Sequence, residues 1–444
     1  MIAGTESGAG KTSFTSGILA ALLRRGLMVQ GFKVGPDFID PSYHTQATGR
    51  PTINLDAFFH GRRRVIGLLQ EGLDDVDVGV IEGVMGLFDG KTPGSSLFGS
   101  SAEMARWTKT PVLLVVNAAG VANSAAAIVK GFATLARGVR IAGVLFNRVG
   151  SDRHYRLLSD ALAAYRLPPA VGYLPRAAEI ERPSRHLGLV PSMQQGDMAE
   201  YLGRLAGLVE QTVDLDAVLA LARSAEPLAA HKVLPAARSL PSVTVAYAYD
   251  AAFHFYYAAG LRTLERLGAR LVPFSPLQDK TLPQGSQVLL LGGGFPELYA
   301  QELAANTPLL SEVRGFAGPV YAECGGMMYL SRSLTDQSGT RFLMVGRVPA
   351  DVEMQDRLQA LGYGEARLLV PSILGPAGAV LRGHEFHWSR LTGGTPFALE
   401  IRKNGRPTTV DGFAEGNLLA SYFHVDFAAH PKAARALLAA GVRR

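Results

Sequence analysis

Residues 4–12, Gly-Thr-Glu-Ser-Gly-Ala-Gly-Lys-Thr, restrict the fold of this chain more than any other segment. They follow a very short apolar start and precede a stretch with helical spacing. Backbone N–H groups in such a loop can surround phosphate oxygens, and the helix N-terminus adds a favourable dipole. We predict that a nucleotide phosphate chain is bound by Thr5, Ser7, Gly8, Ala9, Gly10, Lys11 and Thr12, with the Thr12 hydroxyl on Mg²⁺.

This loop departs from the common G-x-x-x-x-G-K-[ST] spacing, because Thr5 stands where the first glycine belongs. A plain glycine-rich turn before a helix is the alternative interpretation. The strand that should precede the loop is reduced to residues 1–3, so a start upstream of Met1 also stays open.

The first half of the chain alternates apolar runs with helical patterns, and it has the composition of a core-forming protein. Strands that are apolar throughout are buried on both faces, as in a parallel sheet covered by helices. Right-handed crossovers then give a doubly wound α/β fold. The expected strands are 27–33, 78–82, 112–117, 141–147 and 170–174, with helices at 12–25 and 152–165.

A proline-containing segment without clear periodicity, residues 226–241, is predicted to link two domains, 1–225 and 242–444. A second alternating series follows, so the second domain is also α/β. Its expected elements are strands at 243–249, 270–274 and 288–291, a strand that ends at Ala322, and a helix near 253–267.

Several polar residues at predicted strand ends are candidates for the nucleotide site. Glu82 ends an apolar strand and is expected at the carboxyl edge of the sheet as a second Mg²⁺ ligand; a solvent-facing acid is the alternative. Asn147 ends another strand, where hydrogen bonding to adenine and an ordinary structural role are equally compatible with the pattern.

An acidic segment leaves the strand 27–33 and enters the same region. Lys33 can neutralise phosphate or a substrate carboxylate, Asp37 can bind Mg²⁺, and Asp40 can orient an acceptor. A transition-metal site formed by Asp37, Asp40 and His44 is a weaker alternative. A capped turn is another, since Gly-Pro-Asp and Asp-Pro are common in turns.

The only cysteine, Cys324, lies between a predicted strand and helix, with small residues two positions before and after it. This spacing is typical of a strained nucleophile elbow, and a helix N-terminus favours the thiolate. A structural cysteine is the alternative. His424 is predicted to accept the thiol proton, with Asp426 orienting its imidazole. The backbone N–H groups of Gly293 and Gly294 are predicted to face the oxyanion of bound substrate.

With these residues in place, the chain resembles the cobyrinic acid a,c-diamide synthases along nearly its whole length. The resemblance is carried by the residues above and by further segments, which are 47–56, 82–90, 185–190, 291–297, 323–326 and the Gly-His-Glu-Phe-His stretch 383–387. It implies a P-loop domain that binds ATP, Mg²⁺ and a corrinoid, followed by a class I glutamine amidotransferase domain.

The resemblance further implies an ATP-dependent ligase of cobalamin synthesis. The c and then the a carboxylate of cobyrinic acid would be phosphorylated, and ammonia released from L-glutamine at Cys324 would replace the phosphate. The class I pattern His-x-Glu reads His424-Val-Asp426 here, which leaves the role of Asp426 open. Cobyric acid synthase differs where this chain has Gly-Pro-Asp-Phe-Ile-Asp-Pro.

Hydrogenobyrinic acid and a nickel tetrapyrrole remain alternative substrates, and a homodimer remains an open alternative to a monomer. A P-loop partitioning or regulatory ATPase is the hypothesis from another class, but Glu6 stands where such proteins carry a lysine. The net charge of +6 comes mostly from scattered arginines, so we expect no nucleic acid partner. No membrane partner is expected either, and the expected location is cytoplasmic.

Overall fold

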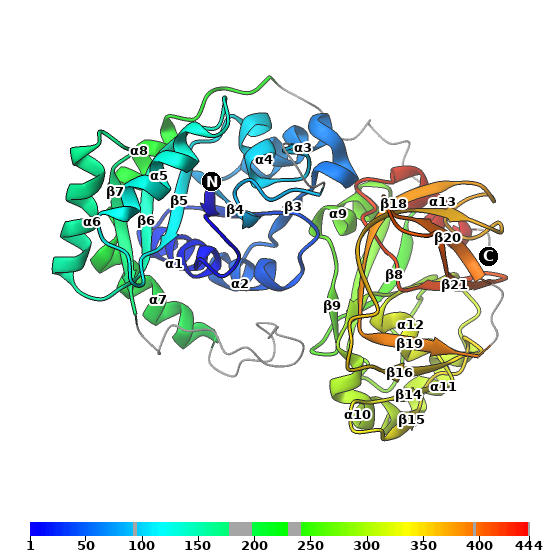
Figure 1. Cartoon of the computed structure of the whole chain (residues 1–444). Helices are drawn as coiled ribbons and strands as arrows, with labels where there is room; N and C mark the ends of the chain where they lie inside the picture. The colour runs from blue at the N-terminus through cyan, green and yellow to red at the C-terminus, as the bar shows by residue number, and fades with distance from the viewer. Residues whose placement is uncertain (92–95, 177–197, 230–240, 394–396, 443–444) are drawn as a thin grey trace. The chain divides into compact units, whose positions relative to one another are not determined.

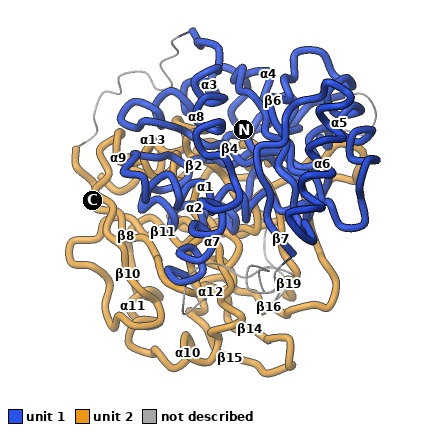
Figure 2. The backbone as a smooth tube through the Cα atoms, turned by 90° about the vertical axis from the view of Figure 1, so that its left-hand side faces the viewer, with its two compact units in different colours: residues 1–233 blue, residues 234–444 orange. Residues whose placement is uncertain are grey.

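The computed structural model describes residues 1–91, 96–176, 198–229, 241–393 and 397–442. The chain divides into two compact units, Met1–Val233 and Leu234–Arg444 (Figure 2). The linker proposed at 226–241 falls largely outside the described residues, so its bounds remain a proposal.

The first unit is built on a parallel seven-stranded sheet in the order β3-β2-β4-β1-β5-β6-β7 (Figure 1). The doubly wound α/β fold is therefore present. Strand β3 was not expected, because its three residues form no apolar run long enough to read. The strands are β1 (Ile2–Gly4), β2 (Val29–Val34), β3 (Ile53–Leu55), β4 (Val78–Gly86), β5 (Val112–Asn117), β6 (Ile141–Val149) and β7 (Ala170–Pro175).

Helices cover both faces of this sheet, with α1, α2 and α7 on one face and α3 and α4 on the other (Figure 1). Because β1 lies between β4 and β5, the loop after β1 meets the end of β4 at one edge. The helices are α1 (Lys11–Arg24), α2 (Ile39–Thr48), α3 (Ala57–Leu73), α4 (Ser101–Thr108), α5 (Ser124–Thr134), α6 (Asp152–Ala164), α7 (Met198–Thr212) and α8 (Leu215–Arg223).

The second unit contains a ten-stranded mixed sheet in the order β10-β8-β11-β13-β22-β21-β20-β17-β18-β23. Its first five strands are parallel and the others are antiparallel. They are β8 (Val243–Ala248), β10 (Ala269–Phe274), β11 (Val288–Leu291), β13 (Val320–Glu323), β17 (Ala360–Leu368), β18 (Val380–His387), β20 (Phe397–Arg402), β21 (Thr409–Glu415), β22 (Leu418–Ser421) and β23 (His424–Val425).

Two smaller sheets complete the strands of this unit. One pairs β9 (Phe253–Phe255) with β12 (Gly293–Gly294). The other has the order β15-β14-β16-β19. Its strands are β14 (Ser333–Thr335), β15 (Arg341–Leu343), β16 (Asp351–Met354) and β19 (Ser389–Thr392).

The helix predicted near 253–267 is wrong at its start, because residues 253–255 pair as a strand with the glycines of β12. The helix begins only at Ala258. The helices of this unit are α9 (Ala258–Arg266), η4 (Pro296–Tyr299), α10 (Ala300–Ala305), α11 (Thr307–Gly315), α12 (Gly325–Leu330) and α13 (Pro431–Val442). In the described part of the chain, no helix combines the length and apolarity that crossing a membrane requires.

The order of the large sheet matters for the second site. β22 and β23 are separated by only two residues, yet β23 pairs with β18 at the far end of the strand order. The antiparallel strands therefore curl back toward β22. This brings the end of β18 beside the turn that follows β13, where Cys324 lies.

Candidate active sites

The loop after β1 borders a cavity of about 470 Å³ in the first unit. Gly8 and Gly10 have φ angles of 79° and 106°, in the left-handed region that favours glycine. A side chain at Gly10 would also clash with the amide of Asn147. The predicted residues that line the cavity are Ser7, Gly8, Gly10, Lys11, Thr12, Lys33, Asp37, Asp40, Glu82 and Asn147.

Two predicted loop residues, Thr5 and Ala9, do not line this cavity. The Thr5 backbone N–H donates to the Val115 carbonyl at 3.1 Å. The Ala9 carbonyl accepts a hydrogen bond from Asn147 Nδ2 at 2.9 Å. Asn147 therefore holds the loop from the neighbouring strand β6, and its role toward adenine stays a prediction.

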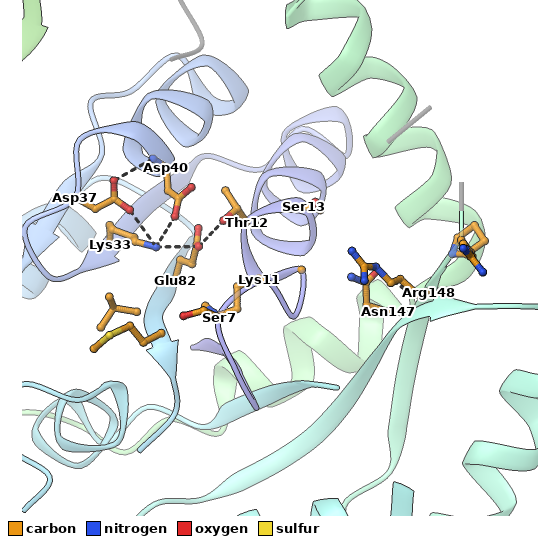
Figure 3. Close-up of a pocket in the computed structure, with 16 residues that line it drawn as sticks. Ser7, Lys11, Thr12, Ser13, Lys33, Asp37, Asp40, Glu82, Asn147 and Arg148 are labelled. Atoms are coloured by element: carbon orange, nitrogen blue, oxygen red, sulfur yellow. Dashed lines mark hydrogen bonds and ion pairs between the residues drawn. The ribbon is translucent and has the colours of Figure 1, made fainter. Parts of the chain in front are cut away.

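The Glu82 carboxylate lies at the centre of a charged cluster on one side of the cavity (Figure 3). Glu82 pairs in register with Ile2 of β1 and Lys33 of β2. Its Oε1 accepts a hydrogen bond from Thr12 Oγ1 at 2.7 Å and lies 2.9 Å from Lys33 Nζ. Its Oε2 lies 2.7 Å from Nε2 of the buried His44.

Lys33 joins this acid to the segment that follows β2. Its Nζ lies 2.7 Å from Asp40 Oδ2 and 3.5 Å from Asp37 Oδ2. Burial alone would lower the pKa of Lys33, but Asp40, Glu82 and Asp37 outweigh it and raise that pKa. Lys33 therefore remains a cation inside a group of three carboxylates.

The two aspartates differ in their surroundings. Asp37 Oδ1 accepts backbone hydrogen bonds from Ile39 at 2.8 Å and Asp40 at 3.3 Å, so it caps the start of α2. Burial and the charge of Asp40 raise the pKa of Asp37 to about 7, although Lys33 opposes them. Asp40 makes the closer contact with the Lys33 ammonium group.

The residues at this edge fit a magnesium ion held together with a nucleotide. Mg²⁺ commonly takes one or two protein ligands, with phosphate oxygens and waters completing its shell. Thr12 and Glu82 already share one contact. Within the described ranges, no three His, Cys, Asp or Glu side chains form a ready metal group. The transition-metal alternative is not supported, because His44 faces Glu82 and Lys33 pairs with both aspartates.

In the second unit, Cys324 forms the sharp turn between β13 and α12. Its φ angle is 46°, which is strained for a residue with a side chain. A side chain at Gly326 would clash with the Leu291 carbonyl, and one at Gly325 would lie 2.9 Å from Pro296 Cδ. The small residues read from the sequence are therefore required by the tight packing of an elbow.

His424 is the partner of this cysteine, and it is almost completely buried. Burial lowers the pKa of His424, but hydrogen bonds to Cys324 and Glu323 and their charges outweigh it and raise the pKa to about 10. The Nδ1 atom lies 3.3 Å from Glu323 Oε2. The geometry is that of a thiol–imidazole pair backed by a carboxylate.

The structure corrects the position predicted for Asp426. Glu323, rather than Asp426, lies against the outer nitrogen of the imidazole. The Asp426 carboxylate accepts a hydrogen bond from the Ala428 backbone N–H at 2.8 Å and lies near Gly260. Sequence analysis missed Glu323, although an acid at the end of a buried strand directly before the nucleophile was a usable signal.

The two glycines predicted at the oxyanion position lie beside this pair. A side chain at Gly293 would approach His424 Cε1 to 2.7 Å, and one at Gly294 would clash with the Ala252 carbonyl. These glycines let the backbone of β12 pack directly against the imidazole and β9. Their role as N–H donors to an oxyanion remains a proposal.

The Gly-His-Glu-Phe-His stretch in β18 forms another wall of the site. His384 lies opposite His424 in the strand pair, and Cys324 Sγ lies 3.9 Å from the Phe386 carbonyl oxygen. His387 stacks on Tyr422 with 3.8 Å between ring centres. Burial lowers the pKa of His384 to about 3 and that of His387 to about 4, so both are neutral.

Comparison with known proteins gives matches to both units. Residues 1–190 match the CobQ/CobB/MinD/ParA nucleotide binding domain, and residues 244–432 match the CobB/CobQ-like glutamine amidotransferase domain. Residues 185–190, which contributed to the resemblance, lie outside the described residues.

Full-length relatives carry one name. A cobyrinate a,c-diamide synthase of Syntrophotalea carbinolica is 45% identical over 99% of this chain and 97% of its own length. One of Caldanaerobacter subterraneus is 41% identical over 96% and 94%. One of Dehalococcoides mccartyi is 41% identical over 98% and 96%.

Proposed function

This chain belongs to the cobyrinate a,c-diamide synthase family, and we propose that its two sites divide that reaction between acid activation and ammonia release. Membership makes the protein a glutamine-dependent carbon–nitrogen ligase of cobalamin biosynthesis with a nucleotide-binding domain. The regulatory ATPase alternative is set aside, because residues 244–432 match a glutamine amidotransferase domain. The proposal adds ATP, Mg²⁺ and the steps at each site.

One observation carries the proposal. The chain holds a phosphate loop with a charged cluster in one unit and a Cys324–His424 pair in the other. An acid does not form an amide with ammonia readily, because hydroxide is a poor leaving group. Phosphorylation supplies a better leaving group, and each site supplies one half of that chemistry.

In the first unit, the loop amides and Lys11 are proposed to hold the β- and γ-phosphates of ATP. Mg²⁺ at Thr12 and Glu82, with Asp37 as a further candidate ligand, would offset phosphate charge. An oxygen of the c and then the a carboxylate of cobyrinic acid attacks the γ-phosphorus, and ADP leaves. Ammonia then attacks the acyl carbon, phosphate leaves with the C–O bonding electrons, and nitrogen loses a proton. Asp40 and Lys33 are proposed to place the acceptor carboxylate.

In the second unit, Cys324 is proposed to attack the side-chain amide of glutamine, with Gly293 and Gly294 facing the developing oxyanion. Ammonia released there would be transferred to the acyl phosphate. Hydrogenobyrinic acid and a nickel tetrapyrrole remain alternative acceptors. A cytoplasmic location is proposed, since ATP and glutamine are both abundant there.

Oxygen transfer tests the acyl phosphate. Cobyrinic acid carrying ¹⁸O in its carboxylates is incubated with ATP and ammonia, and inorganic phosphate is analysed by mass. The proposal predicts one ¹⁸O atom per phosphate for each amide formed. Amide formation with unlabelled phosphate would contradict it. Parallel incubations with hydrogenobyrinic acid and nickel sirohydrochlorin rank the acceptors by rate.

A further inference from the structure

The carboxylate of Glu323 joins the strand that carries the nucleophile to the strand that carries the histidine. Glu323 ends β13 directly before Cys324, and its side chain is buried. Its Oε2 lies 3.3 Å from His424 Nδ1. Its Oε1 accepts hydrogen bonds from the Tyr321 hydroxyl at 2.7 Å and from the Val425 backbone N–H at 3.0 Å.

We propose that Glu323 is the positioning residue of the glutaminase site and completes a Cys324–His424–Glu323 triad through a residue adjacent to the nucleophile. This inference rests on the glutaminase half of the proposed function and does not depend on the phosphoryl half. It replaces the assignment of Asp426, whose carboxylate accepts from Ala428.

The geometry fixes which tautomer of His424 is present. A carboxylate accepts hydrogen bonds, so Glu323 requires a proton on the facing Nδ1. This leaves Nε2 unprotonated and able to take the Cys324 thiol proton. The imidazolium that results is stabilised by the same carboxylate. Glu323 does not itself take up a proton.

The chemical step balances without another reactant. Cys324 gives its proton to His424 Nε2, and its thiolate attacks the amide carbon of glutamine. Collapse of the tetrahedral intermediate breaks the C–N bond, and the Nε2 proton goes to the departing nitrogen as ammonia forms. Water then hydrolyses the thioester to glutamate and restores the thiol.

Two contacts show that the Glu323 carboxylate is fixed rather than mobile. Tyr321 lies two positions earlier on β13, so it projects from the same face of the strand and its hydroxyl reaches Oε1. The Val425 N–H comes from the residue after His424. One oxygen therefore sets the position of β23 while the other faces the imidazole.

Glu323→Gln is the informative variant, because it keeps the shape but can present an N–H to Nδ1. That would favour the tautomer with a proton on Nε2, which cannot act as the base. We expect glutaminase kcat to fall about 10²- to 10⁴-fold with little change in the KM for glutamine. Glu323→Asp should recover part of this loss, and Tyr321→Phe should cost much less than Glu323→Gln.

The single cysteine provides a readout that a merely structural role would not move. Iodoacetamide modifies Cys324 alone, so the rate of alkylation against pH reports its thiolate. The native protein should react at a nearly constant rate from about pH 6 to 9, as expected of an ion pair. Glu323→Gln should instead show a rate that rises toward the ordinary thiol pKa of about 8.5.

Ammonia-dependent synthesis and thermal unfolding separate this inference from loss of fold. Both should match the native protein in Glu323→Gln. Native glutaminase activity in that variant would overturn the inference, as would an unchanged alkylation profile. If Glu323→Gln lowers the unfolding temperature, the decision rests on Glu323→Asp: no recovery of the alkylation profile, in a variant that unfolds like the native protein, also overturns it. Failure of synthesis in the native protein would count against the proposed function alone.

Discussion

Lys33 Nζ lies 2.9 Å from Glu82 Oε1, the same oxygen that accepts the Thr12 hydroxyl. A Mg²⁺ ion held by Thr12 and Glu82 needs lone pairs at this position. The Lys33 ammonium group is therefore expected to balance the carboxylates when no metal is bound and to yield part of that contact when metal and nucleotide bind.

Replacing Lys33 by methionine tests this exchange. Three carboxylates would lose their buried counter-charge, which should cost about 3–5 kcal/mol of stability. We expect the unfolding temperature of Lys33→Met to fall in EDTA and to rise with added Mg²⁺ more than that of the native protein. Lys109→Met is the control, because it removes only an exposed pair with Glu226. Equal Mg²⁺ responses in all three proteins would contradict the exchange.

The two aspartates after β2 are predicted to act differently. Asp40→Asn should change the ratio of monoamide to diamide while nucleotide binding is largely kept, because Asp40 is proposed to position the acceptor. Asp37→Asn should slow both amidations. Mass analysis of products over time distinguishes them. A proportional slowing of both steps in Asp40→Asn, with weaker nucleotide binding, would place Asp40 with the metal ligands instead.

A buried acid behind the glutaminase site predicts a pH-dependent stability. Asp411 Oδ2 accepts the Tyr422 backbone N–H at 2.8 Å. Burial and the charge of Glu385 raise the pKa of Asp411 from 3.8 to about 7, although backbone hydrogen bonds oppose them. Between these values the folded protein keeps a proton that the unfolded chain releases. The free energy of unfolding should therefore fall with rising pH, by about 1.4 kcal/mol per unit from this group.

Asp411→Asn cannot lose this proton, so its stability relative to the native protein should rise between about pH 5 and 7. Urea unfolding at several pH values measures the difference. Glu353→Gln is the control, because its exposed carboxylate pairs with Arg390 and its difference from the native protein should stay flat. A constant difference for Asp411→Asn would show that Asp411 does not titrate in this window.

The parallel core was predictable because each of its main strands is a continuous apolar run. β5 was expected at the residues where it occurs, and Glu82 was placed at the right edge because parallel strands end together. The antiparallel strands β17–β21 were not expected. Several of their residues are exposed, so they lack an apolar run that marks a buried strand.

Glu323 shows why part of the site could not be read from the sequence. Its contact with His424 spans 101 positions and depends on β23 lying against β18 rather than continuing from β22. The sequence offered Asp426 as the nearer acid, two residues from the histidine. Local spacing therefore identified the nucleophile and the base, but the partner of the base is set by the curl of the sheet.

The most direct test of the division between two sites is product mass after incubation with cobyrinic acid and ATP, with glutamine or ammonia as nitrogen donor. The native protein should form the diamide with either donor. Cys324→Ser should form it with ammonia alone, and Lys11→Ala should form none with either donor while it still hydrolyses glutamine. Equal loss with both donors in Cys324→Ser, or normal ammonia-dependent amidation in Lys11→Ala, would contradict the account.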